Sequence, residues 1–262
     1  MRKPVLIANW KMNKTITEGR SFVDEINCLI KDIRKGDFSN RLEVIIAPSF
    51  TALSSLAYII DEIEIGLAAQ NMHWEDKGAY TGEISPQFLE EIGCGHVIIG
   101  HSERRHIFKE NSDIINKKII AALRHKISPV FCVGERLEER ESGKTFKVIE
   151  KELTEGLKGI SKEDINNIMI AYEPVWAIGT GKNATPRQAN EVHLFIRKKI
   201  GSDFGTNVAS SIRILYGGSV TPDNIEELIA EDEIDGALIG GASLKAESFA
   251  EIIRCVFEKR SA

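Results

Sequence analysis

Eight short apolar segments, spread over the whole chain, most constrain how this sequence can fold. They recur at intervals of roughly 20 to 40 residues, and most are continuously apolar and β-branched, which is typical of strands buried on both faces of a parallel sheet. The expected strands are residues 5–8, 44–47, 63–69, 97–99, 130–133, 168–171, 212–215 and 237–239.

Helical patterns fill the spaces between these segments. Apolar residues recur with a helical period within residues 22–33, 189–200 and 249–257. A hydroxyl N-cap followed by proline at the first helical position favours a helix start. The sequence has three such pairs, at Ser85, Thr185 and Thr221. Gln188 lies three residues after Thr185 and completes a capping box.

The alternation of eight strands with helices predicts an α/β protein with one (β/α)8 barrel, in which eight parallel strands are ringed by helices. A length of 262 residues suits this fold, and no linker or charge block divides the chain, so we expect one domain over residues 1–262. The alternative is an open doubly wound sheet. Its dinucleotide-binding members carry a G-x-G-x-x-G turn after the first strand, whereas this strand ends in Asn9-Trp10-Lys11.

The composition excludes several classes of partner. A net charge of −5 gives no electrostatic footprint for nucleic acid, and no apolar segment approaches the roughly 20 residues that span a bilayer. The four cysteines are scattered without a Cys-x-x-Cys spacing, which favours free thiols in a reducing compartment. We therefore expect a cytoplasmic protein that binds neither nucleic acid nor membrane.

The residues that directly follow the strands are the candidate site residues, because barrel enzymes carry their active sites at the carboxyl ends of the strands. Asn9 and Lys11 follow the first strand, His101 and Glu103 follow the fourth, and Glu173 follows the sixth. Lys11 is open to two interpretations at this point, a Schiff-base lysine or an electrostatic anchor. The presence of a carboxylate and a neutral histidine favours the anchor.

Glycine pairs follow the last two strands, at Gly217-Gly218-Ser219 and at Gly240-Gly241. Glycine leaves backbone N–H groups uncovered, and the start of a following helix favours an anion there. The loops after strands seven and eight of a barrel often bind phosphate. Tight strand-to-helix turns are the alternative explanation, but two such turns, with a hydroxyl at Ser219, favour a phosphate site.

His101 is the histidine at the catalytic end of the predicted barrel, directly before a helix start at Ser102. A helix amino terminus disfavours a positive imidazolium, so a neutral ring that donates a hydrogen bond is expected. The sequence offers no further ligands at metal spacing, and we expect no metal site. No serine lies in a G-x-S-x-G nucleophile elbow, which argues against a serine hydrolase.

Glu173 begins a segment that combines a carboxylate with an apolar loop. Pro174 keeps Glu173 extended at the strand end, and the apolar residues 175–178 lead to Gly179. Such a loop can close over a site, with glycines as hinges. A structural salt bridge under a static loop explains Glu173 equally well when this segment is taken alone.

Together, the strand ends supply one base, one neutral hydrogen-bond donor, one cation and one phosphate cradle. This set suits proton transfer next to the carbonyl of a small phosphorylated sugar, through an enediolate, without a cofactor. A Schiff-base aldolase, another phosphate-binding lyase and a catalytically silent relative are the competing hypotheses.

The chain resembles the triosephosphate isomerase family over essentially its whole length. Seven segments in the family's order carry the resemblance, and together they are specific. They are Ala-Asn-Trp-Lys-Met-Asn at 8–13, Ala-Gln-Asn at 69–71, Gly-Ala-Tyr-Thr-Gly-Glu-Ile-Ser at 78–85, Ile-Gly-His-Ser-Glu-Arg-Arg at 99–105, Ala-Tyr-Glu-Pro-Val-Trp-Ala-Ile-Gly-Thr-Gly-Lys at 171–182, Tyr-Gly-Gly-Ser-Val at 216–220 and Gly-Gly-Ala-Ser-Leu at 240–244.

The resemblance implies a TIM barrel that interconverts D-glyceraldehyde 3-phosphate and dihydroxyacetone phosphate, in glycolysis and gluconeogenesis, with no cofactor or metal. By motif position, Glu173 would be the base and His101 the neutral electrophile. Asn9 and Lys11 would lie beside His101, with Glu103 behind Lys11. The residues implied to bind the substrate are Asn9, Lys11, Gly179, Ser219, Gly240 and Gly241.

The resemblance also implies a homodimer. The loop from Gly78 to Glu83 would enter the partner subunit, with Thr81 directed towards its active site. The differences from the family pattern lie at residues 73–75 and at Asn183. They concern the interface and the hinge rather than the catalytic positions.

Overall fold

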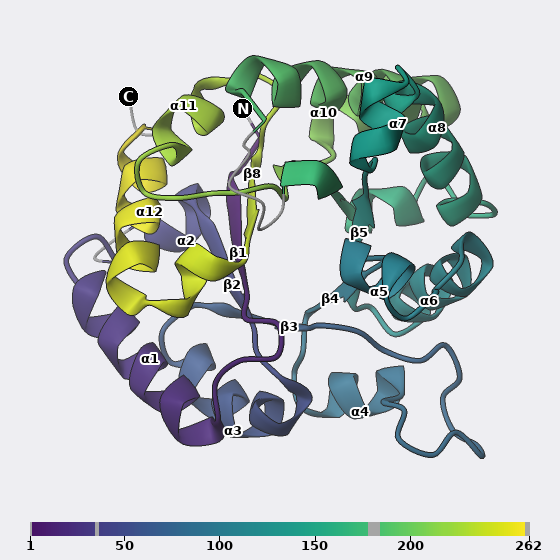
Figure 1. The fold of residues 1–262 in the computed structure, drawn as a ribbon. Coiled ribbons are helices and arrows are strands. Elements are labelled where there is room, and N and C mark those ends of the chain that lie inside the picture. The colour runs from purple at the N-terminus through teal and green to yellow at the C-terminus, as the bar shows by residue number, and fades with distance from the viewer. Residues whose placement is uncertain (1, 35–36, 178–183, 260–262) are drawn as a thin grey trace.

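Eight parallel strands close into a barrel within the part of the chain that the computed structural model describes, residues 2–34, 37–177 and 184–259 (Figure 1). Neighbours along the sequence are also neighbours in the barrel, and β1 pairs with both β2 and β8. The strands are β1 (Val5–Asn9), β2 (Glu43–Ala47), β3 (Gly66–Ala69), β4 (His96–Ile99), β5 (Ser128–Val133), β6 (Met169–Tyr172), β7 (Ile214–Tyr216) and β8 (Gly236–Ile239). The predicted fold is confirmed.

The third predicted strand was too long. The apolar run 63–69 forms a strand only from Gly66, because Ile63 and Ile65 lie in the turn after α3. There the N–H groups of both residues bond to the carbonyl of Ile60. Their side chains are 5% and 4% exposed, so they are apolar because they pack into the core and not because they pair with a neighbouring strand.

Helices surround the barrel, and the helices that follow the strands begin on the side where the strands end (Figure 1). The α-helices are α1 (Ile16–Leu29), α2 (Phe38–Arg41), α3 (Phe50–Asp61), α4 (Pro86–Glu91), α5 (Ser102–His106), α6 (Ser112–Arg124), α7 (Leu137–Glu141), α8 (Thr145–Gly156), α9 (Pro186–Phe204), α10 (Thr206–Ser211), α11 (Ile225–Ala230) and α12 (Ala246–Lys259). The 3-10 turns are η1 (Asp164–Asn167), η2 (Val175–Ala177) and η3 (Gly241–Leu244).

Two of the three predicted helix starts are confirmed. Ser85 caps α4, and Thr185 forms the expected capping box with Gln188 at the start of α9. The start predicted at Thr221 was wrong. The side chain of Asn224 accepts the N–H of Thr221 and closes a turn, so α11 begins only at Ile225.

The core consists of two layers. Side chains that alternate along the strands fill the barrel interior, among them Ile7, Ile45 and Ile98. The intervening strand residues point outwards and pack against the helices in a larger second layer. Burying an aliphatic side chain of this size is worth about 1.5–3 kcal/mol, so both layers hold the strand ends rigidly around the site.

The loop between β3 and α4 extends furthest from the barrel (Figure 1). At its base, the N–H of His73 donates to the carbonyl of Ile84 at 2.8 Å. The segment from Gly78 to Glu83 is exposed to solvent. Among the described residues, none of the helices is long and apolar enough to cross a membrane.

Candidate functional site

A cavity of about 510 Å³ lies at the carboxyl ends of the strands and contains most of the predicted site residues. Glu103 lies behind Lys11 rather than in the lining, and Gly179 falls outside the described residues. The predicted residues that line the cavity are Asn9, Lys11, His101, Glu173, Ser219, Gly240 and Gly241. Residues at the ends of β1, β4, β6, β7 and β8 therefore converge, as expected for a site at the carboxyl ends of barrel strands.

Glu173 is fixed at the end of β6 and is only 2% exposed. Its backbone N–H donates to the carbonyl of Val133 at 2.8 Å, which holds it beside β5. Its carboxylate accepts the N–H of Ser102 at 2.9 Å, the hydroxyl of Ser102 at 3.2 Å and Nε2 of His101 at 3.0 Å. Burial opposes ionisation, but the imidazole and the Ser102 amide outweigh it and lower the pKa of Glu173.

His101 caps the amino end of α5. Its Nδ1 accepts the N–H of Glu103 at 3.3 Å, so in this geometry the ring proton lies on Nε2 and points towards Glu173. Burial opposes protonation of the ring, yet the adjacent carboxylate of Glu173 raises the pKa of His101. The protonation of His101 therefore depends on where the carboxylate of Glu173 lies.

Lys11 lies two residues after the end of β1 in a left-handed backbone conformation, with φ of 53°. Its N–H donates to Oδ1 of Asn9 at 3.0 Å, and its Nζ lies 2.7 Å from Oε1 of Glu103. Glu103 thus holds the cation at the cavity wall and partly balances its charge. The pairing fixes the position of the Lys11 side chain beside an anionic partner.

The glycine turns after β7 and β8 also line the cavity, together with Ser219. Gly217 also has a second role that the sequence did not predict. A Cβ there would lie 2.9 Å from Cγ of Glu173, so any other residue would displace the Glu173 side chain. Gly134 gives similar clearance, since a Cβ there would lie 1.8 Å from the carbonyl oxygen of Glu173.

Ser102 is a functional contact that sequence reasoning missed. It was treated as a helix start, yet both its N–H and its hydroxyl bond to Glu173. Ser102 follows His101 directly at the end of β4, and that position is the signal that was available. The long separation of Ser102 and Glu173 along the sequence concealed the contact.

The loop after Glu173 begins with the 3-10 turn η2. Nε1 of Trp176 donates to Oε1 of Glu135 at 3.0 Å, and the hydroxyl of Tyr172 donates to the same oxygen at 3.1 Å. Arg140 also contacts this carboxylate, at 3.3 Å. The predicted apolar lid is therefore anchored where it leaves β6, while its remainder, including Gly179, lies outside the described residues.

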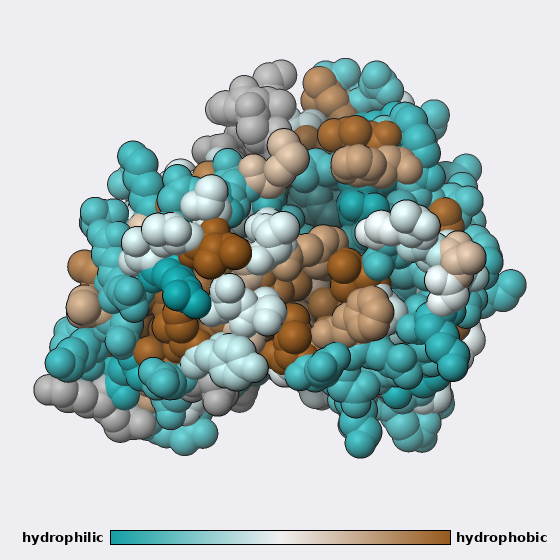
Figure 2. Space-filling model, turned by 90° about the horizontal axis from the view of Figure 1, so that it is seen from below, coloured by the Kyte–Doolittle hydropathy of each residue, from teal (hydrophilic) through white to brown (hydrophobic). Residues whose placement is uncertain are grey.

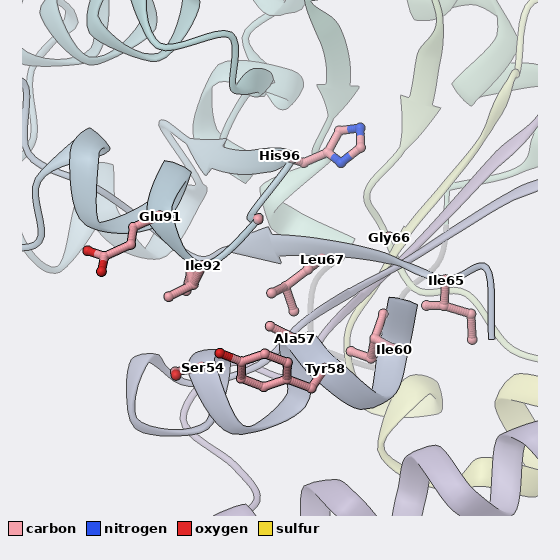
Figure 3. Close-up of a pocket in the computed structure, with 12 residues that line it drawn as sticks. Ser54, Ala57, Tyr58, Ile60, Ile65, Gly66, Leu67, Glu91, Ile92 and His96 are labelled. Atoms are coloured by element: carbon pink, nitrogen blue, oxygen red, sulfur yellow. The ribbon is translucent and has the colours of Figure 1, made fainter. Parts of the chain in front are cut away.

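A second cavity, of about 560 Å³, lies between α3, β3 and the end of α4 (Figure 3). Ile60, Ile65 and Leu67 line it together with polar side chains such as Glu91 and His96. Figure 3 shows that the ionisable side chains at its edge, such as His96, do not converge on a common point. It therefore lacks the combination of groups that the first cavity provides.

Comparison with known proteins gives a consistent result. The family model described as Triosephosphate isomerase matches residues 4–256. A protein named triosephosphate isomerase from Caldanaerobacter subterraneus subsp. tengcongensis is 53% identical over 253 residues, covering 97% of this chain and 99% of the relative. Proteins of the same name from Geotalea uraniireducens and Thermoanaerobacter pseudethanolicus are 50% and 51% identical, each covering 97% of this chain and 99% of the relative.

Proposed function

Because this chain belongs to the triosephosphate isomerase family and interconverts D-glyceraldehyde 3-phosphate and dihydroxyacetone phosphate, we propose that Glu173 is the base of this reaction. The observation that carries the proposal is the contact of 3.0 Å between Glu173 and His101 in the cavity. A buried carboxylate beside a hydrogen-bond donor can take a proton from carbon while the donor stabilises the oxygen that becomes negative.

The proton moves in two steps. Glu173 removes a proton from C1 of dihydroxyacetone phosphate, and the C–H electron pair forms the C1–C2 double bond while the carbonyl oxygen on C2 becomes an enediolate oxygen. After proton exchange between the two oxygens, Glu173 returns its proton to C2 and the carbonyl forms at C1. The product is glyceraldehyde 3-phosphate, and no electron acceptor is needed.

His101 is proposed to donate Nε2–H to the two substrate oxygens in turn. A glutamate base with a neutral histidine is the known pair in this family. Where the two side chains are in contact, the carboxylate of Glu173 raises the pKa of His101 against the opposing effect of burial. When the carboxylate of Glu173 turns towards a substrate carbon, it no longer raises the pKa of His101. Burial and the start of α5, whose N–H from Glu103 faces Nδ1, then favour the neutral ring.

The phosphate is proposed to lie against Ser219, Gly240 and Gly241, which line the same cavity as Glu173. Backbone N–H groups and a hydroxyl suit phosphate oxygens, and Lys11 adds a fixed charge. Asn9 is proposed to contact the substrate from beside Lys11. Gly179 is proposed to contact the phosphate when the lid closes, and a closed lid would exclude water from the enediolate.

An assay of glyceraldehyde 3-phosphate conversion tests the assignment directly. Glu173→Gln keeps the shape of the side chain but cannot accept the carbon proton, so the variant should retain substrate binding and lose almost all turnover. Turnover close to that of the parent would remove Glu173 from the role of base. A borohydride trap addresses the alternative chemistry: a covalent adduct at Lys11 would indicate a Schiff-base enzyme instead.

We further propose a homodimer formed by the face that carries α3, α4 and the loop from Gly78 to Glu83. Figure 2 views the molecule from that side and shows apolar side chains gathered near its middle. Exposed apolar side chains of these segments and of the neighbouring loop after β1 are Met12, Phe50, Tyr58, Tyr80 and Phe88. Exposed apolar surface of this kind often marks an interface.

Thr81 is proposed to approach the active site of the partner subunit. Sedimentation measures the assembly, and Thr81→Arg should produce a monomer with reduced activity because a bulky charge would enter the interface. A monomer in the parent protein would contradict the proposal. A cytoplasmic location and one domain over residues 1–262 also remain predictions, which cell fractionation and limited proteolysis would test.

A further inference from the structure

Gln70, the residue directly after β3, connects the backbone of Lys11 to the end of β2. Its Nε2 donates to the carbonyl of Lys11 at 2.8 Å and to the carbonyl of Ala47 at 2.9 Å. Ala47 is the last residue of β2, and its carbonyl also accepts the N–H of Trp10 at 3.1 Å. One amide group therefore uses both of its hydrogens to hold the chain where it leaves β1.

The conformation that Gln70 holds is one that residues with a side chain avoid. A positive φ brings Cβ close to a backbone carbonyl oxygen, and Lys11 has φ of 53°. Such conformations persist when the surroundings fix them from more than one side. Asn9 accepts the N–H of Lys11, and Gln70 donates to its carbonyl. Both peptide groups of Lys11 are thus held by side chains.

The direction of the Lys11 side chain follows from this backbone. The left-handed turn aims Cβ so that Nζ reaches Oε1 of Glu103 at 2.7 Å while the side chain still lines the cavity. Rotation of φ to a negative value would swing Cβ and move Nζ away from this position. The contact with Gln70 is therefore linked to the position of the cation.

We propose that Gln70 is a positioning residue that acts through Lys11, holding its backbone in the left-handed turn that directs the ammonium group towards the anionic oxygens of the substrate. This inference rests on the proposed role of Lys11 in substrate binding. The competing explanation is a structural one, in which Gln70 only ties the ends of β2 and β3 to the loop after β1.

Gln70→Met keeps the length of the side chain and removes both hydrogen bonds. We expect kcat/KM to fall by about 10- to 100-fold, mainly through KM, because a charged group displaced by about 1 Å loses much of its effect. Asn116→Leu is the matched control. Asn116 is also half-buried and bridges two carbonyls, those of Gly156 and Lys158 at 2.8 and 2.9 Å, and it does not line the active-site cavity.

Both variants lose two amide hydrogen bonds, so both should lower Tm, but only Gln70→Met should lower kcat/KM by more than twofold. Equal losses of kcat/KM in the two variants would overturn the proposal. If Gln70→Met does not fold, Gln70→Asn gives the same test, because its shorter side chain retains the amide but cannot reach both carbonyls.

A double-mutant cycle separates the two explanations. In a Lys11→Met background, adding Gln70→Met should change kcat/KM by less than twofold if Gln70 acts through Lys11, whereas a structural role would give the same fold-loss as in the parent. Calorimetry gives the same comparison without turnover. It measures the dissociation constant of inorganic phosphate for the parent, the two single variants and the double variant. If Lys11→Met alone changes neither quantity, the proposed role of Lys11 fails. If Lys11→Met weakens both while Gln70→Met weakens neither, the inference about Gln70 fails.

Discussion

The two ends of the barrel hold buried charge in different ways. At the amino end, Arg197 contacts the carboxylates of both Glu233 and Asp235, with Asp235 Oδ2 at 2.7 Å. Arg197 also donates to the carbonyls of Ala209 and Ile212, at 2.7 and 2.9 Å. These charges face one another and nearby backbone groups, so each is compensated within the protein.

At the carboxyl end, the charges face a cavity. Glu173 and Lys11 both line it, and their present partners, His101 and Glu103, leave them directed towards the space that a substrate would fill. Lys11 is also held in a strained backbone conformation. Buried charge alone thus does not distinguish the two ends. Charge that faces a cavity, together with strain that the surroundings maintain, indicates the functional one.

Removing a charge from the amino end should affect stability and leave catalysis unchanged. Arg197→Met leaves the carboxylate of Asp235, which is 2% exposed, with Arg2 as its remaining cationic partner. An uncompensated buried charge costs about 3–5 kcal/mol, and because Arg2 still compensates part of this charge, urea unfolding should show a loss near the lower end of this range. The protein that remains folded should keep its kcat and KM. A fall in kcat with little loss of stability would show that the two ends are coupled.

A change at the carboxyl end should instead lower catalysis and leave stability unchanged. Glu173→Asp withdraws the carboxylate by one methylene, and a displacement of about 1 Å lowers kcat by about 100-fold, which corresponds to about 2.7 kcal/mol. KM and the free energy of unfolding should change little. Steady-state kinetics and urea unfolding measure the two quantities on one preparation.

Glu43→Asp is the control at the amino end. Contacts with His96 and Arg213 outweigh burial and lower the pKa of Glu43 to about 2, so this carboxylate is charged and paired as well. Its shortening should reduce stability without lowering kcat. Comparable losses of kcat from Glu43→Asp and Glu173→Asp would contradict the role of Glu173 as the base.

The sequence predicted the barrel and the site because both follow from local patterns. Apolar runs mark strands, and the residues after each run reach a common end when parallel strands close. The run at 63–69 was assigned wholly to a strand because burial looks the same in a strand and in a packed turn. Contacts between distant segments left no such pattern, and Ser102 with Glu173 is the clearest example. The clearance at Gly217 was hidden for the same reason.

Gly217→Ala tests that clearance. The added Cβ would lie 2.9 Å from Cγ of Glu173, and the carboxylate side chain can yield more easily than the backbone. Displacement of the base should lower kcat/KM on the order of 10-fold, about 1.4 kcal/mol, with a smaller change in Tm. Gly95→Ala is the matched control, because a Cβ there meets nothing within 4 Å. Equal kinetics in the two variants would show that Gly217 is needed only for its turn.

His125 connects the two ends of the barrel. It lies at the end of α6, near the amino end, and its Nε2 is 2.9 Å from Asp76 in the loop that leaves the carboxyl end. Its Nδ1 is also 2.9 Å from Glu90 of α4. Both ring nitrogens can donate only when the ring is protonated. Arg124 pairs with the same Asp76 and keeps its charge at all relevant pH values. Part of the link between α6 and this loop therefore does not depend on pH.

The hydrogen bond to Glu90 is the largest cause that raises the pKa of His125, and Asp76 adds to it against the opposing effect of burial. Since the folded pKa lies above the unfolded value of about 6.5, the contribution is fully present below that pH and is lost as pH rises through the folded pKa. His125→Gln should therefore weaken the protection of the His73 amide at the loop base at pH 6 and have little effect at pH 9. Hydrogen exchange, corrected for its intrinsic pH dependence, measures this smallest of the expected effects. The ring contacts a carboxylate with each nitrogen, so the expected loss of protection depends on its charge. An equal loss of protection at pH 6 and at pH 9 would mean that the neutral ring holds the loop by packing. The charge on His125 would then have no part in joining the two ends.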